Sequence, residues 1–417
     1  MDKALKNKQY FKFCAYGFLK NLRFFDAFLL LFFLESGITY TQIGILYAVR
    51  EIIINISEIP SGFIADLYGR KNSLIAAFVF YIISFLIFYL FDSFYLFALA
   101  IAFYGIGDAF RSGTHKGIIM DYLALNNWSD QKANYYGHTR SWSQKGSALS
   151  ALIAGLLVLY TGSYRTVFLF SVVPYFINFL NIYSYPNNLN FSLKKHTRSE
   201  KSSWSFIFKS FLNTLKNPKV LQIINSSALH SAYLKAIKDY IQPIMVQVAL
   251  RIPILSFTNT KNKTGVVIGV LYFLIYLATS YASKQSFKIS KSVNLNIPKK
   301  TLLLGLISGA VCGLLFHFEF WVISLLFFTL IYILENIRKP LLTGEIADHV
   351  APEILTSVIS AQSFFSTIST SIIAISIGIF ADSFDIGISF IIISTMLLIL
   401  TTLLNALKLK SGKNINH

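Results

Sequence analysis

One short stretch of the sequence, YGIGDAFRSGTHKGIIMDY (104–122), combines an apolar helical pattern with several ionisable residues. They are Asp108, Arg111, His115, Lys116 and Asp121. An ionisable side chain at the centre of a bilayer costs on the order of 3 kcal/mol, so such residues usually face a wet cavity or the inside of a helix bundle. A carboxylate can take up and release a proton, and arginine can hold an anionic group through two hydrogen bonds. The stretch therefore predicts a path for protons or for a polar solute.

The same combination recurs in three other apolar segments. Residues three or four apart share a helix face, which predicts four opposite-charge pairs: Arg23 with Asp26, Asp108 with Arg111, Lys235 with Asp239, and Glu335 with Arg338. His115 continues the face of Asp108 and Arg111, and His230 and Lys238 lie in the segment of Lys235. Each pair could also be structural and hold helices together. That alternative is strongest for Glu335 and Arg338, because they lie near the end of their segment.

The chemistry of these side chains suggests separate roles. Asp26 and Asp108 are the first candidates for proton carriers, because the pKa of a carboxyl group follows its partner and its solvation. His115 and His230 are second candidates, since histidine titrates nearer neutrality. Fixed positive charges at Arg23, Arg111, Lys235 and Lys238 suit a solute with an anionic group.

The composition is that of a polytopic membrane protein. The chain has 417 residues, of which 54% are hydrophobic and only 13% charged, against about 25% charged in a soluble domain. The net charge of +18 comes from basic clusters between apolar segments, which is typical of topology signals rather than of nucleic-acid binding. The sequence has neither a Gly-rich phosphate loop nor metal-ligand spacing. We therefore expect no enzyme activity, no cofactor and no metal.

Twelve apolar segments are long enough to cross a membrane. Lys and Arg gather in the first twelve residues, in alternate loops and in the tail, which predicts that both termini are cytoplasmic. Arg165 in the fifth loop, and Arg251, Lys261 and Lys263 in the seventh, are the exceptions. The predicted spans are 13–35, 40–64, 73–91, 94–121, 141–160, 165–184, 219–249, 264–283, 301–317, 319–341, 353–380 and 385–407.

These spans divide into an all-α protein of two six-helix halves. The predicted parts are 1–184, a basic cytoplasmic connector over 185–218, a second half over 219–407 and a cytoplasmic tail over 408–417. A faint repeat supports the division, since AGLLVLYTGSYRTVFLFS (154–171) and IGIFADSFDIGISFIIIS (377–394) bridge corresponding spans.

The loop between the second and third spans reads GFIADLYGRKNSL (62–74). It resembles the signature of the major facilitator superfamily, G-x-x-x-D-x-x-G-R-K/R, with Gly62, Asp66, Gly69, Arg70 and Lys71 in place. Physically, Gly62 would permit close helix contact and Gly69 a tight turn. The resemblance implies that Arg70 pairs with Asp121 at the cytoplasmic end of the fourth span. It also implies that Asp66 faces the start of the eleventh span, that these residues latch the cytoplasmic side, and that spans one, four, seven and ten line a central path.

The sequence also departs from patterns common in that family. The second copy of the signature, expected near YASKQSFKIS (281–290), is degenerate, and Ile101 replaces an arginine found in many members. Ser150 and Ala151 stand where many drug–proton antiporters have Gly-Pro, which weakens a drug-export interpretation.

We therefore predict a monomeric secondary transporter in the cytoplasmic (inner) membrane that works by alternating access. Its partners would be the bilayer, a proton and a small polar solute, anionic or zwitterionic, with the direction of transport open. One alternative is a multidrug/proton antiporter that exports amphiphilic compounds. Another is a receptor or lipid-handling protein that kept the fold, against which the intact signature argues.

Overall fold

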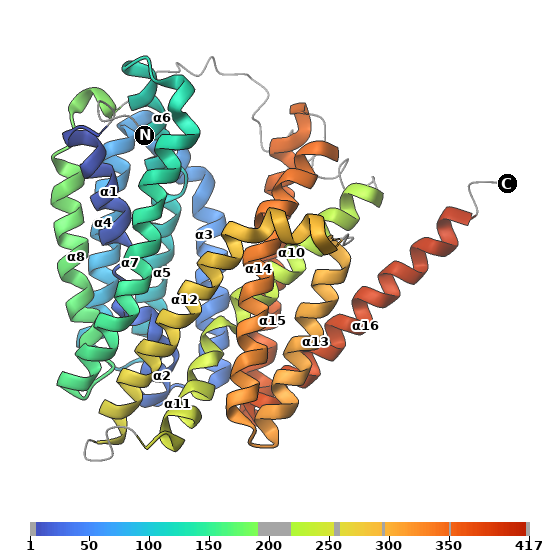
Figure 1. Ribbon diagram of the computed structural model, residues 1–417. Coiled ribbons are helices and arrows are strands. Elements are labelled where there is room, and N and C mark those ends of the chain that lie inside the picture. Colours follow the sequence, from blue (N-terminus) through green and yellow to red (C-terminus); the bar gives the residue numbers. More distant parts are fainter. Residues whose placement is uncertain (1–5, 191–217, 254–258, 294–296, 350–351, 414–417) are drawn as a thin grey trace. The chain divides into compact units, whose positions relative to one another are not determined.

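The structure is a computed structural model that describes residues 6–190, 218–253, 259–293, 297–349 and 352–413, and helices dominate these residues (Figure 1). Each of the twelve predicted spans is mostly helical over its described residues, with breaks inside the first and fourth spans. Most of the predicted connector (residues 191–217) and the end of the tail (residues 414–417) lie outside the described residues. The described chain forms two compact units.

The first unit comprises Met1–Ile38, Leu46–Ser203 and Ala249–Leu277. Within it α4 packs against α5 and α8, and α1 packs against α7 and α8; Figure 1 shows these helices running alongside one another. Buried aromatic rings, such as the stacked pair Phe25 and Phe168, fill the space between them. Its helices are α1 (Lys8–Lys20), η2 (Phe24–Ala27), α2 (Leu29–Glu35), most of α3 (Tyr40–Tyr68), α4 (Arg70–Leu90), α5 (Phe94–Arg111), α6 (Thr114–Leu125), η3 (Ser129–Gln131), α7 (Lys132–Thr161), α8 (Thr166–Tyr183), η4 (Asn187–Leu189) and the first part of α12 (Thr260–Val293).

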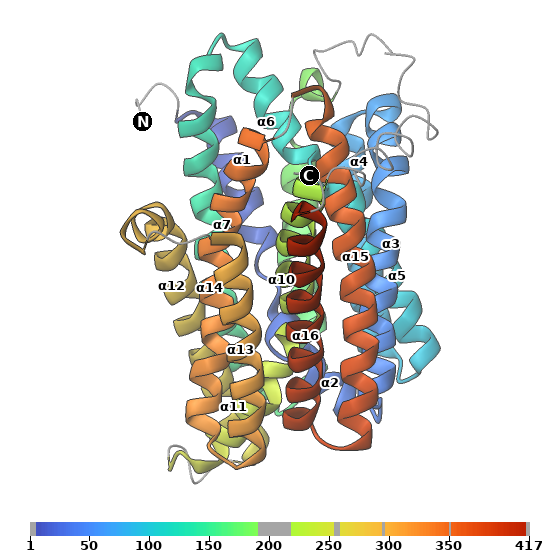
Figure 2. The same ribbon diagram turned by 90° about the vertical axis from the view of Figure 1, so that its right-hand side faces the viewer.

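The second unit comprises Thr39–Ile45, Trp204–Val248 and Ala278–His417. Here α10 packs against α13, α14 and α15, while α13 also packs against α14 and α16, as Figure 2 shows. Its helices are α10 (Pro218–Ile237), η5 (Lys238–Tyr240), most of α11 (Ile241–Arg251), the last part of α12, α13 (Ile297–His317), α14 (Trp321–His349), α15 (Pro352–Ser383) and α16 (Ile386–Lys413).

The predicted halves follow the order of the chain, whereas the compact units exchange two segments. Thr39–Ile45 belongs to the second unit and Ala249–Leu277 to the first. The exchanged segments make close backbone contacts inside their units. A Cβ added to Gly44 would overlap the Ala374 carbonyl, and one added to Gly155 would lie 2.8 Å from the Gly265 carbonyl oxygen.

Eight helices of the described chain are long and apolar enough to span a membrane. Of the four predicted spans outside this group, the twelfth appears as a shorter apolar helix, Ile386–Thr402, and the other three are interrupted or charged. The first divides into α1, η2 and α2, the seventh divides into α10, η5 and α11, and α3 carries Arg50, Glu51 and Glu58. The interruptions coincide with intramembrane charges, which places Arg23 and Asp26 in irregular backbone.

Candidate solute and proton site

The first span breaks where its charges lie. After α1 ends at Lys20, the Asn21 amide donates to the Gly17 carbonyl at 2.7 Å, and the Tyr175 hydroxyl donates to the Lys20 carbonyl at 2.9 Å. These bonds satisfy carbonyl groups that the end of a helix leaves open. Phe24 and Phe25 are buried on the far side of the break. Capped carbonyls and buried rings thus fix the irregular backbone that carries Arg23 and Asp26.

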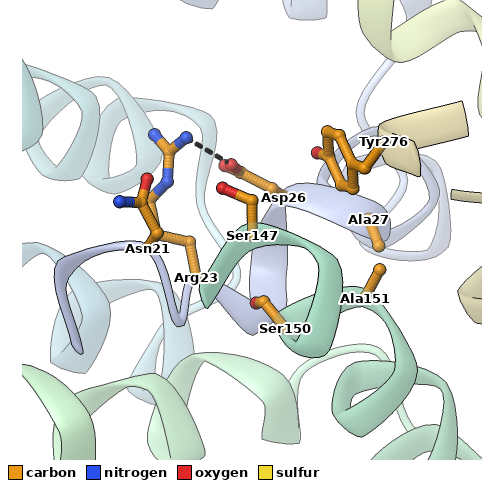
Figure 3. A pocket seen from close by; sticks show the side chains of 8 residues that line it. All are labelled: Asn21, Arg23, Asp26, Ala27, Ser147, Ser150, Ala151 and Tyr276. Carbon is orange, nitrogen blue, oxygen red and sulfur yellow. Dashed lines mark ion pairs between the residues drawn. The ribbon is translucent and has the colours of Figure 1, made fainter. Parts of the chain in front are cut away.

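Arg23 and Asp26 form an ion pair across this break, with 2.9 Å between Nη2 and Oδ2 (Figure 3). Arg23 Nη1 also donates to the Tyr104 hydroxyl at 3.0 Å, which ties the break to α5. Both side chains are partly accessible, 34% for Arg23 and 19% for Asp26. The pair expected from sequence is therefore present, although it lies in 3-10 geometry rather than along a continuous helix.

A small cavity lies beside Asp26. It has about 10 Å³ of space for water and is lined by Asn21, Arg23, Asp26, Ala27, Ser147, Ser150, Ala151 and Tyr276 (Figure 3). That space is close to the minimum for one water molecule and far below that of a metabolite site. Ser150 Oγ is buried and has no hydrogen-bond partner among the described residues. One water molecule there would satisfy Ser150 and bring a proton donor close to the Asp26 carboxylate.

Asp108 and Arg111 form a second pair at the end of α5. Arg111 donates to Asp108 Oδ1 from Nη2 at 2.8 Å and from Nε at 3.2 Å. The buried Tyr81 hydroxyl completes a triangle, because it donates to Asp108 Oδ1 at 2.6 Å and accepts from Arg111 Nε at 2.9 Å. Three hydrogen bonds therefore converge on one carboxylate oxygen of Asp108.

His115 does not continue this face, contrary to the expectation from sequence. The fourth span breaks at Ser112 and Gly113, where Gly113 has φ +70°, so the helical spacing that would align His115 with Arg111 does not apply. The His115 ring instead stacks on Tyr16 with centroids 3.5 Å apart, and its Nε2 lies 3.2 Å from the Tyr185 hydroxyl. The break carries an ordinary turn signal in the Ser-Gly dipeptide.

The signature residues gather at the other end of α4. Arg70 Nη1 lies 2.5 Å from Asp121 Oδ2, and both side chains are largely buried. A Cβ on Gly117, one turn before Asp121, would lie 2.6 Å from Arg70 Nη1, so this glycine makes room for the pair. Asp66 is exposed. The resemblance places it opposite the start of the eleventh span, where the side chains of residues 353–361 are not described, so that contact stays a prediction.

The two signature glycines differ from each other. Gly69 precedes α4 with φ +98°, so the predicted tight turn is confirmed. Gly62 is exposed and a Cβ there would meet nothing within 4 Å among the described residues. The predicted close helix contact at Gly62 is therefore not made within the described residues and stays a prediction.

Asn190, which sequence analysis did not single out, holds the signature loop in place. Its Oδ1 accepts from the backbone N–H groups of Lys71 at 3.0 Å and Asn72 at 3.3 Å, and its carbonyl accepts from the Arg70 N–H at 2.6 Å. Lys71 reaches the same segment, because its Nζ donates to the Tyr185 carbonyl at 2.7 Å. The chain after α8 thus supplies the cap that Gly69, without a side chain, cannot supply.

In the second unit, Glu335 on α14 binds two residues of α10. It accepts from Ser231 Oγ, and its Oε2 lies 2.8 Å from His230 Nδ1. His230 and Arg338 are fully buried, and Arg338 lies within electrostatic range of both His230 and Glu335. Sequence spacing grouped Glu335 with Arg338 alone, because a partner on another helix leaves no trace in spacing.

The remaining predicted pair lies where α10 gives way to η5. Lys238 Nζ lies 3.6 Å from Asp239 Oδ1, and Asp239 is buried. Lys235 is exposed on the last turn of α10. The change from α-helix to 3-10 helix at Lys238 removes the regular spacing on which the pairing of Lys235 with Asp239 was predicted.

Four further charged side chains lie at the end of the first unit where the turn between α7 and α8 is found. Arg165 pairs with Asp92, and Lys261 pairs with Glu35. A cavity of about 460 Å³ opens there, lined by Phe32, Glu35, Ser36, Asp92, Ser163 and Arg165. Burial raises the pKa of the adjacent Tyr164, and the Glu35 carboxylate adds to this. Arg165 and Lys261 are among the basic residues that disagreed with the predicted topology, and each is neutralised by an acid from another loop.

The bundle architecture and charged interior define a class, the multi-pass membrane transporters. The profile of the Major Facilitator Superfamily matches residues 16–283, so the chain belongs to that family, as the signature loop indicated. It is a transporter of a small-molecule solute and not an enzyme.

One curated relative is an uncharacterized MFS-type transporter, YxaM of Bacillus subtilis (strain 168), with 22% identity over 383 residues, 90% of this chain and 89% of the relative.

Solved transporters share the fold at low sequence identity. The nucleoside transporter NupG, as a point mutant, is 14% identical, with a TM-score of 0.76 and coverage of 95% of this chain and 99% of that one. A mutant of the peptide transporter POT in complex with sulfate has 14% identity, a TM-score of 0.71 and coverage of 97% and 95%. A bacterial homolog of the human lysosomal transporter Spinster has 14% identity, a TM-score of 0.67 and coverage of 91% and 84%. These likenesses concern the fold and do not identify a solute.

Proposed function

We propose that this protein moves a small polar solute, anionic or zwitterionic, across the cytoplasmic membrane by alternating access, coupled to a proton. The observation that carries the proposal is the pair of linked clusters in the first unit, Arg23–Asp26–Tyr104 and Arg111–Asp108–Tyr81. Charged groups this deep in a span are costly and mark solute or ion paths. Guanidinium groups are suited to carboxylate or phosphate groups and poorly suited to lipophilic cations.

Asp26 is the better of the two candidates for the proton carrier. Asp108 Oδ1 accepts three hydrogen bonds and is therefore already engaged by Arg111 and Tyr81. Asp26 adjoins a cavity with room for about one water molecule. The Ser150 hydroxyl in the lining of this cavity has no hydrogen-bond partner among the described residues. A carboxylate beside a cavity that water can enter can change its proton affinity when its solvation changes. We therefore assign proton exchange to Asp26 and a fixed negative charge to Asp108.

The pairing of loop charges supports the proposed orientation. With Arg165 and Lys261 neutralised by Asp92 and Glu35, Arg251 and Lys263 are the basic residues left over from the predicted exceptions at that end of the first unit. The positive-inside rule then favours a cytoplasmic position for the end that carries Arg70, Lys71 and the start of α1. The pair of Arg70 with Asp121 would latch that cytoplasmic side.

A thermal-shift screen of the purified protein tests the solute class, because a ligand stabilises the state that it binds. The panel pairs glutamate, succinate and glucose 6-phosphate with lipophilic cations such as tetraphenylphosphonium. The matched variant is Asp108→Asn/Arg111→Gln, which removes both charges of one pair and leaves the net charge unchanged. Stabilisation of the wild type by an anionic compound, reduced in the variant, supports the proposal. Stabilisation by lipophilic cations alone overturns it in favour of a multidrug exporter.

A further inference from the structure

Lys20 is a basic residue of the first unit that takes part in none of the ion pairs described above. Lys20 is the last residue of α1, a helix of 13 residues that starts at Lys8, so it lies about 18 Å along the axis from that start. Its ammonium has no carboxylate or hydrogen-bond partner among the described residues, and the aromatic group nearest to it is the Tyr16 ring, 6.0 Å from Nζ. Placing a lysine without a partner at this depth is energetically costly, and such residues usually mark a functional site.

The surroundings of Lys20 carry an unbalanced positive charge. Arg23, Asp108 and Arg111 all lie within electrostatic range of Lys20. Asp26 balances Arg23, and Asp108 balances Arg111. With both carboxylates paired in this way, Lys20 is the basic residue of this group that forms no ion pair with a described carboxylate. The exposed Arg140 on α7 also lies within range and adds to the positive potential.

We propose that Lys20 is the residue that binds the anionic group of the transported solute, a carboxylate or a phosphate. This inference rests on the proposed function and deepens it, because it names one residue and one functional group. An oxyanion beside Lys20 would compensate its charge and accept a charge-assisted hydrogen bond. The paired arginines would then set the surrounding potential while keeping their own carboxylates.

A helix-capping role is the competing explanation. A cation at the C-terminus of a helix interacts favourably with its dipole, by about 0.3–1 kcal/mol. In that case Lys20 would stabilise α1 and leave solute binding unaffected. If Lys20 caps the helix, a neutral side chain lowers the melting temperature of the free protein. If Lys20 binds the solute, a neutral side chain lowers the affinity for an anion.

The test is a ligand titration by thermal shift on the full chain with Lys20→Gln, Lys20→Arg and the control Lys12→Gln. Lys12 lies on the same helix, and its ammonium donates to the Ser184 carbonyl at 2.6 Å. The probes are glutamate, succinate and glucose 6-phosphate, each beside its uncharged counterpart: glutamine, succinamide and glucose. The carboxylate and phosphate arms show which of the two groups the site takes.

The proposal predicts that Lys20→Gln weakens the binding of the active anionic probe at least tenfold. Lys12→Gln should stay within about threefold of wild type, since Lys12 lies outside the site. Lys20→Arg should bind the probe more tightly than Lys20→Gln does, because it keeps the positive charge. A wild type that binds an anionic probe and a Lys20→Gln variant that binds it equally well overturn the role of Lys20 alone. A wild type that binds no anionic probe overturns the proposed function, and this inference falls with it.

Discussion

The guanidinium of Arg70 lies 2.5 Å from the carboxylate of Asp121, although 51 positions separate them in the sequence. The contact joins the start of α4 to the end of α6 at the signature loop. The two side chains are only 19% and 12% accessible, so water screens the pair weakly.

Neutralising one member of this pair should destabilise the protein. We expect Asp121→Asn to cost about 1–3 kcal/mol, because it leaves a largely buried arginine without its charged acceptor. The double variant Arg70→Gln/Asp121→Asn should recover part of the loss. Thermal unfolding in detergent of the wild type, the two single variants and the double variant completes a double-mutant cycle. The exposed Asp130→Asn is a control that should change stability little. Additive losses in the double variant would show that the pair contributes no coupling.

Asn190→Ala should loosen the signature loop from the segment after α8. The loss of two N–H acceptors at the start of α4 should cost about 1 kcal/mol, as for other helix caps. Asn188→Ala is the matched control, since Asn188 is exposed in the same short segment. Equal melting temperatures for the two variants would contradict the capping role of Asn190.

Two histidine–carboxylate pairs in the second unit allow a comparison of burial. His230 and Glu335 are 2.8 Å apart with His230 fully buried, while His317 and Asp385 are 2.9 Å apart and largely exposed. We expect His230→Ala to cost about 2–4 kcal/mol, through a lost buried hydrogen bond and a new cavity. His317→Ala should cost less than about 0.5 kcal/mol, as is usual for exposed pairs. Similar losses of stability in the two variants would contradict the inference that His230 and Glu335 form a tightly held buried cluster.

Regular spacing predicted local relationships well and distant ones poorly. The sequence was sufficient for the helical spans, for Asp108 with Arg111 and for Arg23 with Asp26, because these depend on residues a single turn apart. His115 was assigned to the wrong face, because the break at Ser112–Gly113 ends the regular helical spacing between Arg111 and His115. Asn190, and the partners of Glu335 and Arg165, come from segments far along the chain, and their positions depend on packing that composition and spacing do not contain.

Proton flux in proteoliposomes tests the central claim most directly. Vesicles containing a pH-sensitive dye would receive wild type, Asp26→Asn or Asp108→Asn, and then the solute selected by the thermal-shift panel. We predict that an anionic solute changes the internal pH of vesicles that contain the wild type. Asp26→Asn should still exchange labelled solute between the two sides, yet produce no pH change. An unaltered pH response in Asp26→Asn, or a response to lipophilic cations alone, would contradict the account.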